Sequence, residues 1–402
     1  MENKMITMDG NTAAAHVAYA FTEVAAIYPI TPSSPMAGST DEWSARGRKN
    51  MFGQTVKLVE MQSEAGAAAA VHGAAQTGCL ATSYTSSQGL MLMIPVLYRM
   101  AGEKLPVVLH VAARTVGTHA MSIFGDHSDV MACRQTGFAQ LSSGSVQEAA
   151  DMAGIAHLSA VKGGIPFMHF FDGFRTSHEI SKISLPDEEK LCSMLDTDAL
   201  RAFRAHALNP EHPMLRNTVQ NGDVYFQLRE AANRFYDSLP EIVEDYMLRF
   251  KENFGREYHI FDYYGHPEAT EVLVAMGSVS GTIRETVDYL NARGRKVGFL
   301  QVRLYRPFAT EKFLAAIPAS AKRIAVLDRC KEMGASGEPL YQDVCTAFSS
   351  SKRDVLIVGG RYGLSSKDTD PAQIAAAFDN LLEENPKNSF TIGITDDVTN
   401  LS

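Results

Sequence analysis

Through the first half of the chain, segments with the hydrophobic pattern of strands alternate with segments that have the composition or spacing of helices. Short apolar runs, rich in β-branched residues, have the length of strands buried in a sheet. These runs are 56–60, 81–85, 106–113 and 165–171. Helical composition or spacing occurs between and after them, at 64–77, 89–102 and 146–161. This alternation of strand and helix is typical of a parallel sheet that helices cover on both faces.

The last third of the chain repeats the alternation more regularly. Apolar runs predict strands at 272–276, 297–304, 323–327, 355–358 and 390–394. Helical patterns separate them at 277–290, 311–317, 340–348 and 371–384. Five strands joined by four helical crossovers predict a second doubly wound domain.

The stretch 177–258 departs from this alternation. It contains Pro210, Pro213 and several Asn and Asp residues, and then a long charged helical pattern at 227–250. We interpret it as a connector that wraps the first domain. The sequence therefore predicts an α/β protein with two doubly wound domains, 1–258 including this connector and 259–402.

Charge and cysteine usage narrow the class of protein. The 402 residues include 37 basic and 46 acidic side chains, a net charge of −9, which argues against nucleic acid as a partner. No apolar run is long enough to cross a membrane, and the N-terminus lacks a secretory pattern. The 5 cysteines are odd in number and show no CxxC spacing, so we expect a reducing cytoplasm and no iron–sulfur cluster or structural zinc in this chain.

Glu64 is a first candidate for chemistry. It opens the alanine-rich helix within VEMQSEAGAAAA, where nearly all neighbours are small or apolar. A carboxylate in such a dry site has a raised pKa and can hold or share a proton. The alternative is a glutamate that only stabilises the first turn of a helix through the helix dipole.

Arg114 is a second candidate, at the end of the apolar run PVVLHVAAR. The carboxyl end of a buried parallel strand faces the crevice where open α/β sheets bind ligands. An arginine there suits a substrate carboxylate, which it can hold through paired hydrogen bonds. The alternative is a structural ion pair with Asp126 or Asp129.

Thr31 is a third candidate, within the proline-rich loop YPITPSSPM at 28–36. Its hydroxyl could face a carboxylate, although a turn with a helix cap at Ser33 or Ser34 is the simpler interpretation. Downstream, the polar segment 125–137 predicts a hydrogen-bonded loop beside the site rather than a metal site.

Nine segments that occur in order along the chain carry a resemblance to a known family. They are YPITPSSPM, VEMQSEAGAAAAVHGAAQTG, SYTSSQGL, GDHSDVMACRQTGFAQL, NPEHPMLRNTVQN, VRLYRPF, LDRCKEMGASGEPLYQDV, GGRYGLSSKD and GITDDVT. Together they closely resemble the N-terminal part of the pyruvate:ferredoxin (flavodoxin) oxidoreductases, which are thiamine diphosphate enzymes. Small departures are Cys330 and Met333, where the family commonly has Thr and Pro.

The resemblance implies roles for both domains and for the three candidates. The first domain would bind the aminopyrimidine of thiamine diphosphate, and the second would be a transketolase C-terminal-type domain. Glu64 stands where the family's glutamate bonds the aminopyrimidine and promotes ylide formation. Thr31 and Arg114 stand where the family holds the pyruvate carboxylate.

The implied reaction is the oxidative decarboxylation of pyruvate with coenzyme A, giving acetyl-CoA, CO2 and reduced ferredoxin or flavodoxin, in anaerobic metabolism. The chain lacks a GDG…N motif for magnesium and diphosphate and lacks cluster cysteines. It would therefore hold half of the thiamine site, with magnesium, coenzyme A and 4Fe–4S clusters bound in missing domains. We expect a dimer, a larger homo-oligomer or partner subunits. Alternatives are an α-type subunit of a multi-subunit 2-oxoacid:ferredoxin oxidoreductase, or a non-catalytic scaffold.

Overall fold

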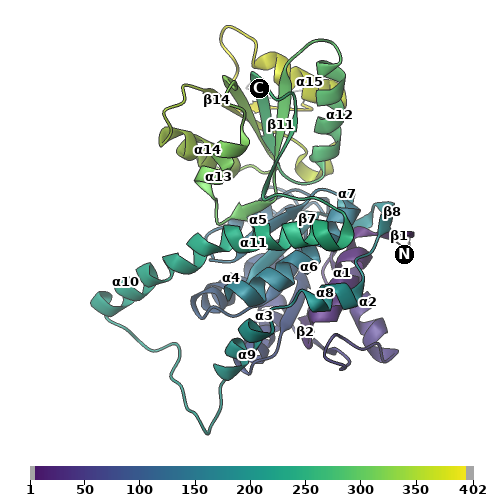
Figure 1. The fold of residues 1–402 in the computed structure, drawn as a ribbon, viewed down its shortest axis with the longest axis vertical. Helices are drawn as coiled ribbons and strands as arrows, with labels where there is room; N and C mark the ends of the chain where they lie inside the picture. The colour runs from purple at the N-terminus through teal and green to yellow at the C-terminus, as the bar shows by residue number, and fades with distance from the viewer. Residues whose placement is uncertain (1–4, 395–402) are drawn as a thin grey trace.

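The computed structural model describes residues 5–394, which form two large sheets covered by helices and one two-stranded ribbon. In Figure 1 the sheet and helices of the second domain lie above those of the first. The predicted α/β fold class with mainly parallel sheets is confirmed. None of the helices in the described part of the chain is long and apolar enough to cross a membrane.

The first domain contains a seven-stranded sheet in the order β12-β6-β7-β5-β4-β2-β3. Its strands are β2 (Val24–Ile27), β3 (Lys57–Glu60), β4 (Ala81–Thr85), β5 (Val108–Ala113), β6 (Ala139–Ser143), β7 (Phe167–Asp172) and β12 (Leu304–Arg306). All neighbours pair in parallel except β12, which is antiparallel to β6. The four predicted strands are present, and β6 and β2 are additional to them.

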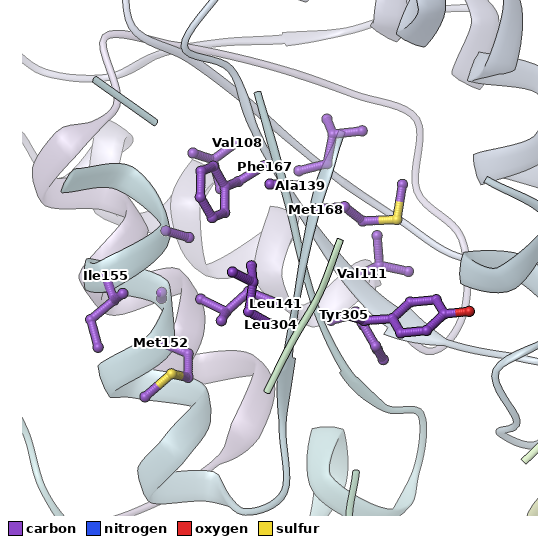
Figure 2. Close-up of a cluster of buried hydrophobic side chains, with 14 of the residues drawn as sticks. Val108, Val111, Ala139, Leu141, Met152, Ile155, Phe167, Met168, Leu304 and Tyr305 are labelled. Atoms are coloured by element: carbon purple, nitrogen blue, oxygen red, sulfur yellow. The ribbon is translucent and has the colours of Figure 1, made fainter. Parts of the chain in front are cut away.

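Helices cover both faces of this sheet. They are α1 (Gly10–Phe21), α2 (Ser34–Ala45), α3 (Glu64–Gln76), α4 (Ser87–Gly102), α5 (Ser128–Ala132), α6 (Val146–Gly163) and α7 (Arg175–His178). In α6 every residue from Ala149 to Val161 is buried, because the helix lies between the sheet and other helices. Figure 2 shows Met152 and Ile155 of α6 with Val108 and Phe167 of the sheet in this core.

The sheet of the second domain differs from the prediction of five strands with four crossovers. It has six strands in the order β15-β14-β13-β10-β11-β9, and β9 is antiparallel to β11. The strands are β9 (Phe261–Gly265), β10 (Glu271–Ala275), β11 (Val297–Val302), β13 (Arg323–Asp328), β14 (Leu356–Arg361) and β15 (Phe390–Thr391). The helices are α12 (Val279–Asn291), α13 (Thr310–Ala316), α14 (Pro339–Ser349) and α15 (Pro371–Asn380).

The strand predicted at 297–304 is in fact split between the two sheets. β11 ends at Val302, and Leu304 then pairs with Leu141 of β6 in the first domain. Leu304 and Tyr305 lie in the core beside Leu141, as Figure 2 shows. The chain of the second domain thus returns to the first, and the division at 258/259 stays a prediction.

The connector only partly wraps the first domain. Its strand β8 (Ile180–Ser184) pairs with β1 (Met5–Asp9) in a separate antiparallel ribbon. The helices are α8 (Glu188–Ser193), α9 (Thr197–Ala205), α10 (Gly222–Ala231) and α11 (Asn233–Phe254). The prediction of one continuous helix over 227–250 is wrong near its start. The helix is interrupted at Ala232, where α10 ends and α11 begins. Figure 1 shows α10 and the loop before it projecting from the body.

Candidate functional site

The parallel pairing of the first sheet brings the three predicted residues to one edge. Thr31 follows β2, Glu64 follows β3, and Arg114 follows β5. The first turn of α4 follows β4, which lies between β5 and β2 in the sheet. Since the carboxyl ends of parallel strands meet at the same edge, these segments lie together at one edge of the sheet, which we call the carboxyl edge.

Glu64 is a buried carboxylate placed by the start of α3. Ser63 caps the helix by accepting the Gly66 N–H at 3.2 Å, so Glu64 is not needed as the cap. The Glu64 side chain lies against Gly89 in the first turn of α4, where an added Cβ would come within 2.6 Å of Oε1. Glu64 is 6% exposed, and no donor from residues 5–394 bonds its carboxylate. This is an acceptor held in a dry, narrow place.

Arg114 has a guanidinium edge without a hydrogen-bond partner among the described residues. Its Nη1 donates to the Thr31 carbonyl oxygen at 2.7 Å, while its Nε is buried without a partner in the described chain. Burial lowers the pKa of Arg114, which is 7% exposed. A planar guanidinium with a free edge fits a carboxylate through two parallel hydrogen bonds.

The alternative ion pair of Arg114 is not found among residues 5–394. No salt bridge joins its guanidinium to Asp126 or Asp129; instead, the Asp129 Oδ2 accepts the backbone N–H of Arg114 at 3.0 Å. The same oxygen accepts the Ser87 N–H at 2.7 Å. Asp129 is completely buried, and burial raises the pKa of its carboxyl to about 7. Through these two hydrogen bonds, Asp129 connects the loop after β4 to the loop after β5.

Thr31 is exposed in a loop whose neighbours are firmly held. Asn11 donates to the Pro32 carbonyl at 2.9 Å, and the Ser33 hydroxyl donates to the Ile30 carbonyl at 2.8 Å. Ser33 does occupy the cap position of α2, but its side chain makes no capping hydrogen bond. The carbonyl of Thr31 accepts a hydrogen bond from Arg114, and Thr31 is exposed at the carboxyl edge.

A buried network beside the site fixes the second domain to the first. Asp172, at the end of β7, accepts from His127 at 2.6 Å and from the Ser278 N–H at 2.8 Å. Arg329 reaches the same carboxylate at 2.5 Å. Burial acts to raise the pKa of Asp172, but Arg329 and His127 outweigh it and hold that pKa far below its usual range. Gly277 (φ 79°) packs so closely that an added Cβ would lie 2.9 Å from the Asp172 carboxylate.

Sequence reasoning proposed Glu64, Thr31 and Arg114 as site residues but did not identify the residues that connect their loops. Ser87 and Gly89 were not singled out, and Asp129 was considered as an ion-pair partner and as part of the predicted hydrogen-bonded loop 125–137. A signal for Gly89 was present, because a glycine in the first turn of an apolar helix removes a side chain where a close neighbour needs the space. No feature of the sequence indicated which backbone N–H groups the Asp129 carboxylate accepts from.

The two-domain α/β fold resembles those of two solved structures. The 2-oxoglutarate:ferredoxin oxidoreductase of Magnetococcus marinus aligns over 94% of this chain and 65% of its own, with a TM-score of 0.68 and 18% identity. A split-gene transketolase aligns over 92% of both chains with a TM-score of 0.50 and 10% identity. At these identities the likeness shows the fold alone.

Family and sequence comparisons identify the chain more closely. Residues 16–248 match the family "Pyruvate flavodoxin/ferredoxin oxidoreductase, thiamine diP-bdg", and residues 269–374 match "Pyruvate:ferredoxin oxidoreductase core domain II". The chain belongs to the pyruvate:ferredoxin/flavodoxin oxidoreductase family and contains its thiamine diphosphate-binding domain.

Full-length relatives are much longer than this chain. It is 61% identical to the pyruvate:ferredoxin oxidoreductase of Moorella thermoacetica, over 98% of this chain and 34% of the relative. It is 60% identical to the pyruvate-flavodoxin oxidoreductase of Enterobacter agglomerans, over 99% of this chain and 34% of the relative. The chain thus spans about a third of these relatives, consistent with an N-terminal portion.

Proposed function

We propose that this chain supplies the aminopyrimidine half of a thiamine diphosphate site in a pyruvate:ferredoxin (flavodoxin) oxidoreductase. The complete enzyme would convert pyruvate and coenzyme A into acetyl-CoA and CO2 and pass electrons to ferredoxin or flavodoxin. The observation that carries the proposal is the buried Glu64 carboxylate, which has no donor from the described residues and faces the space that Gly89 leaves.

Glu64 fits the aminopyrimidine ring by its chemistry. A buried carboxylate without a donor is costly, and a ring N–H of a bound ligand would supply the missing hydrogen bond. When bound, thiamine diphosphate supplies the electron sink for decarboxylation. Glu64 would hold or share the proton at the ring nitrogen, and Gly89 keeps the carboxylate from being displaced.

Arg114 and Thr31 would bind and orient the pyruvate carboxylate. The unpartnered Arg114 Nε provides a donor inside the protein, and the bond from Nη1 to the Thr31 carbonyl fixes the guanidinium plane. The exposed Thr31 side chain lies in the loop that this bond holds. Positioning of this kind fixes the reacting atoms before the chemical step.

The remaining components would come from the two thirds of the relatives that this chain does not cover. We assign to those parts the magnesium–diphosphate half of the site, coenzyme A binding, the 4Fe–4S clusters and the ferredoxin or flavodoxin contact. The five free cysteines support a reducing cytoplasm. The role in anaerobic metabolism is part of the proposal and follows from the family alone. We keep 1–258 and 259–402 as the two functional domains.

The test uses this chain mixed with the remaining two thirds of the Moorella thermoacetica relative. Pyruvate-dependent reduction of a low-potential dye is measured with thiamine diphosphate, magnesium and coenzyme A. Removal of a proton-handling group costs about 10²–10⁴-fold, so we expect Glu64→Gln to lower kcat by at least about 100-fold. The matched control Glu311→Gln, at an exposed position of α13, should keep the parent rate.

Arg114→Lys in the same mixture separates substrate binding from proton handling. Lysine cannot form the paired hydrogen bonds of a guanidinium, so KM for pyruvate should rise more than kcat falls. Equal activity of Glu64→Gln and Glu311→Gln, or an unchanged KM in Arg114→Lys, would show that these residues do not have the roles proposed.

A further inference from the structure

The segment 359–368, GGRYGLSSKD, is one of the nine that carry the family resemblance, and the proposed function gives it no role. It spans the end of β14 and then forms a short 3₁₀ turn at Leu364–Ser366. This turn contacts the first domain at Gly125, in the loop that follows Arg114. The contact therefore links the second domain to the proposed pyruvate site.

Two consecutive serines of the turn have a left-handed backbone, which serine rarely adopts. The φ angle is 53° at Ser365 and 54° at Ser366. Residues other than glycine persist in this region only where surrounding contacts hold them, and they are concentrated at functional sites. Since glycine would adopt the same conformation without strain, the contacts of the two hydroxyl groups are the feature to explain.

Ser366 and Gly125 form a reciprocal pair of hydrogen bonds. The Ser366 N–H donates to the Gly125 carbonyl oxygen at 2.8 Å, and the Gly125 N–H donates to the Ser366 Oγ at 2.9 Å. Beside them, the hydroxyl of Ser365 is hydrogen-bonded to the hydroxyl of Ser122. Gly125 is buried, so without the Ser366 hydroxyl its N–H would have no acceptor among residues 5–394.

Gly125 closes the loop that begins after Arg114. The Thr115 N–H donates to the Phe124 carbonyl oxygen at 3.1 Å, so the two ends of the loop lie side by side. Gly125 itself packs against the end of β5, where an added Cβ would lie 3.1 Å from the Ala113 carbonyl oxygen. A displacement of Gly125 is therefore transmitted to the strand end that carries Arg114.

The turn is not needed to hold the two domains together. Arg329 and Ser278 already bind the Asp172 carboxylate of the first domain, and β12 pairs with β6 in the first sheet. Those contacts are buried, whereas Ser366 is only partly buried. The contact of Ser366 with Gly125 thus has its main effect on the loop and not on domain attachment.

We propose that Ser366 is a positioning residue for pyruvate: the second domain holds Gly125 through this serine and so fixes Arg114 in the orientation that accepts the pyruvate carboxylate. The inference rests on the proposed function, which assigns that carboxylate to Arg114. Ser366 acts through Gly125 and not on the substrate itself. Its loss should therefore weaken pyruvate binding and leave the proton handling of Glu64 intact.

The experiment measures pyruvate-dependent dye reduction by this chain mixed with the remaining two thirds of the Moorella thermoacetica relative. A buried N–H without an acceptor lowers an equilibrium constant about tenfold, so Ser366→Ala should raise KM for pyruvate about tenfold and leave kcat within about twofold. Ser366→Gly should have the same effect, because it also lacks the hydroxyl although it relieves the backbone strain.

Ser389→Ala is the matched control and should keep the parent KM. Ser389 lies in the same domain, is exposed and has a φ angle of 57°. Its hydroxyl makes no hydrogen bond within the described part of the chain. An effect of strain alone would therefore appear in both alanine variants, whereas loss of the contact with Gly125 appears only in Ser366→Ala.

Two further readouts separate positioning from a merely structural role. Amide hydrogen exchange of residues 115–125 in this chain alone should become faster in Ser366→Ala and remain unchanged in Ser389→Ala. In the mixture, Ser366→Ala combined with Arg114→Lys should raise KM no further than Arg114→Lys does alone, because the serine acts through the arginine.

The outcomes distinguish this inference from the proposed function. An inactive mixture of the parent chain overturns the proposed function and, with it, the assignment of pyruvate. If the parent mixture is active, the inference alone is overturned by an unchanged KM in Ser366→Ala, by a parent-like KM in Ser366→Gly, or by additive effects of Ser366→Ala and Arg114→Lys. Unchanged exchange of residues 115–125 in Ser366→Ala overturns it whether or not the mixture is active.

Discussion

Acidification should destabilise the first domain through three buried histidines. His110 of β5 lies between His169 of β7 and His157 of α6, with nitrogen–nitrogen distances of 2.9 Å and 3.2 Å. Burial lowers the pKa of His110 to about 3 and lowers the pKa values of His157 and His169 well below their usual value. All three are therefore neutral in the native protein at pH 5.

The direction follows from proton binding in the two states. Unfolded histidines, with a pKa of about 6.5, take up protons below neutrality, whereas the native cluster does not. Its contribution to stability is complete above pH 6.5 and is lost as the pH falls toward about 3. Between pH 7.5 and pH 5 the loss is about 2 kcal/mol for His110. His157 and His169 add to the loss in the same direction, because burial lowers their pKa values as well.

Amide hydrogen exchange of β5 and β7 measures the free energy of opening of the first domain. This readout separates the first domain from the second in the same protein. His157→Phe replaces one titrating ring by another aromatic ring, which can still stack on Phe21 as His157 does. We expect the loss between pH 7.5 and pH 5 to become smaller, because one group that binds a proton only in the unfolded state has been removed. His119→Gln, at an exposed position, should keep the parent slope. A pH slope that is the same in His157→Phe and in the parent would refute the reasoning.

Two further substitutions test the geometry of the site and of the domain interface. Gly89→Ala should lower kcat in the reconstituted enzyme without lowering the melting temperature, because the new Cβ would lie 2.6 Å from Glu64 Oε1. The activity control is Gly38→Ala, because an added Cβ at this helical position has no atom within 4 Å. Arg303→Met should lower the free energy of unfolding in urea by about 3–5 kcal/mol, because it leaves the Glu148 carboxylate, 2.9 Å away, without its buried partner. Full activity in Gly89→Ala, or an unchanged urea midpoint in Arg303→Met, would contradict these two statements.

The fold was predictable where a strand is apolar throughout. All six residues of β5 are buried, and the run PVVLHVAA is unmistakable in the sequence. β6 has the sequence AQLSS, whose polar side chains are buried in the sheet and hide the strand from a hydrophobic pattern. The pairing of Leu304 with Leu141 joins residues that lie far apart in the chain, and local patterning carries no information about it.

The candidate site was predictable to the same extent and for the same reason. Strand ends locate Arg114 and Glu64, because parallel strands gather their carboxyl ends at one edge. The bonds from the Ser87 and Arg114 backbone to Asp129 come from the three-dimensional arrangement of loops and involve backbone N–H groups that every sequence contains. The closeness of Gly89 to Glu64 likewise appears only once α3 and α4 are packed.

The central claim is that this chain supplies half of a thiamine diphosphate site. Complementation tests this claim most directly. Pyruvate-dependent dye reduction is measured with thiamine diphosphate, magnesium and coenzyme A, first with the chain alone and then with the remaining two thirds of the Moorella thermoacetica relative. We predict activity only in the mixture. Activity of the chain alone would contradict the half-site, and a mixture that assembles but remains inactive would contradict the catalytic role itself.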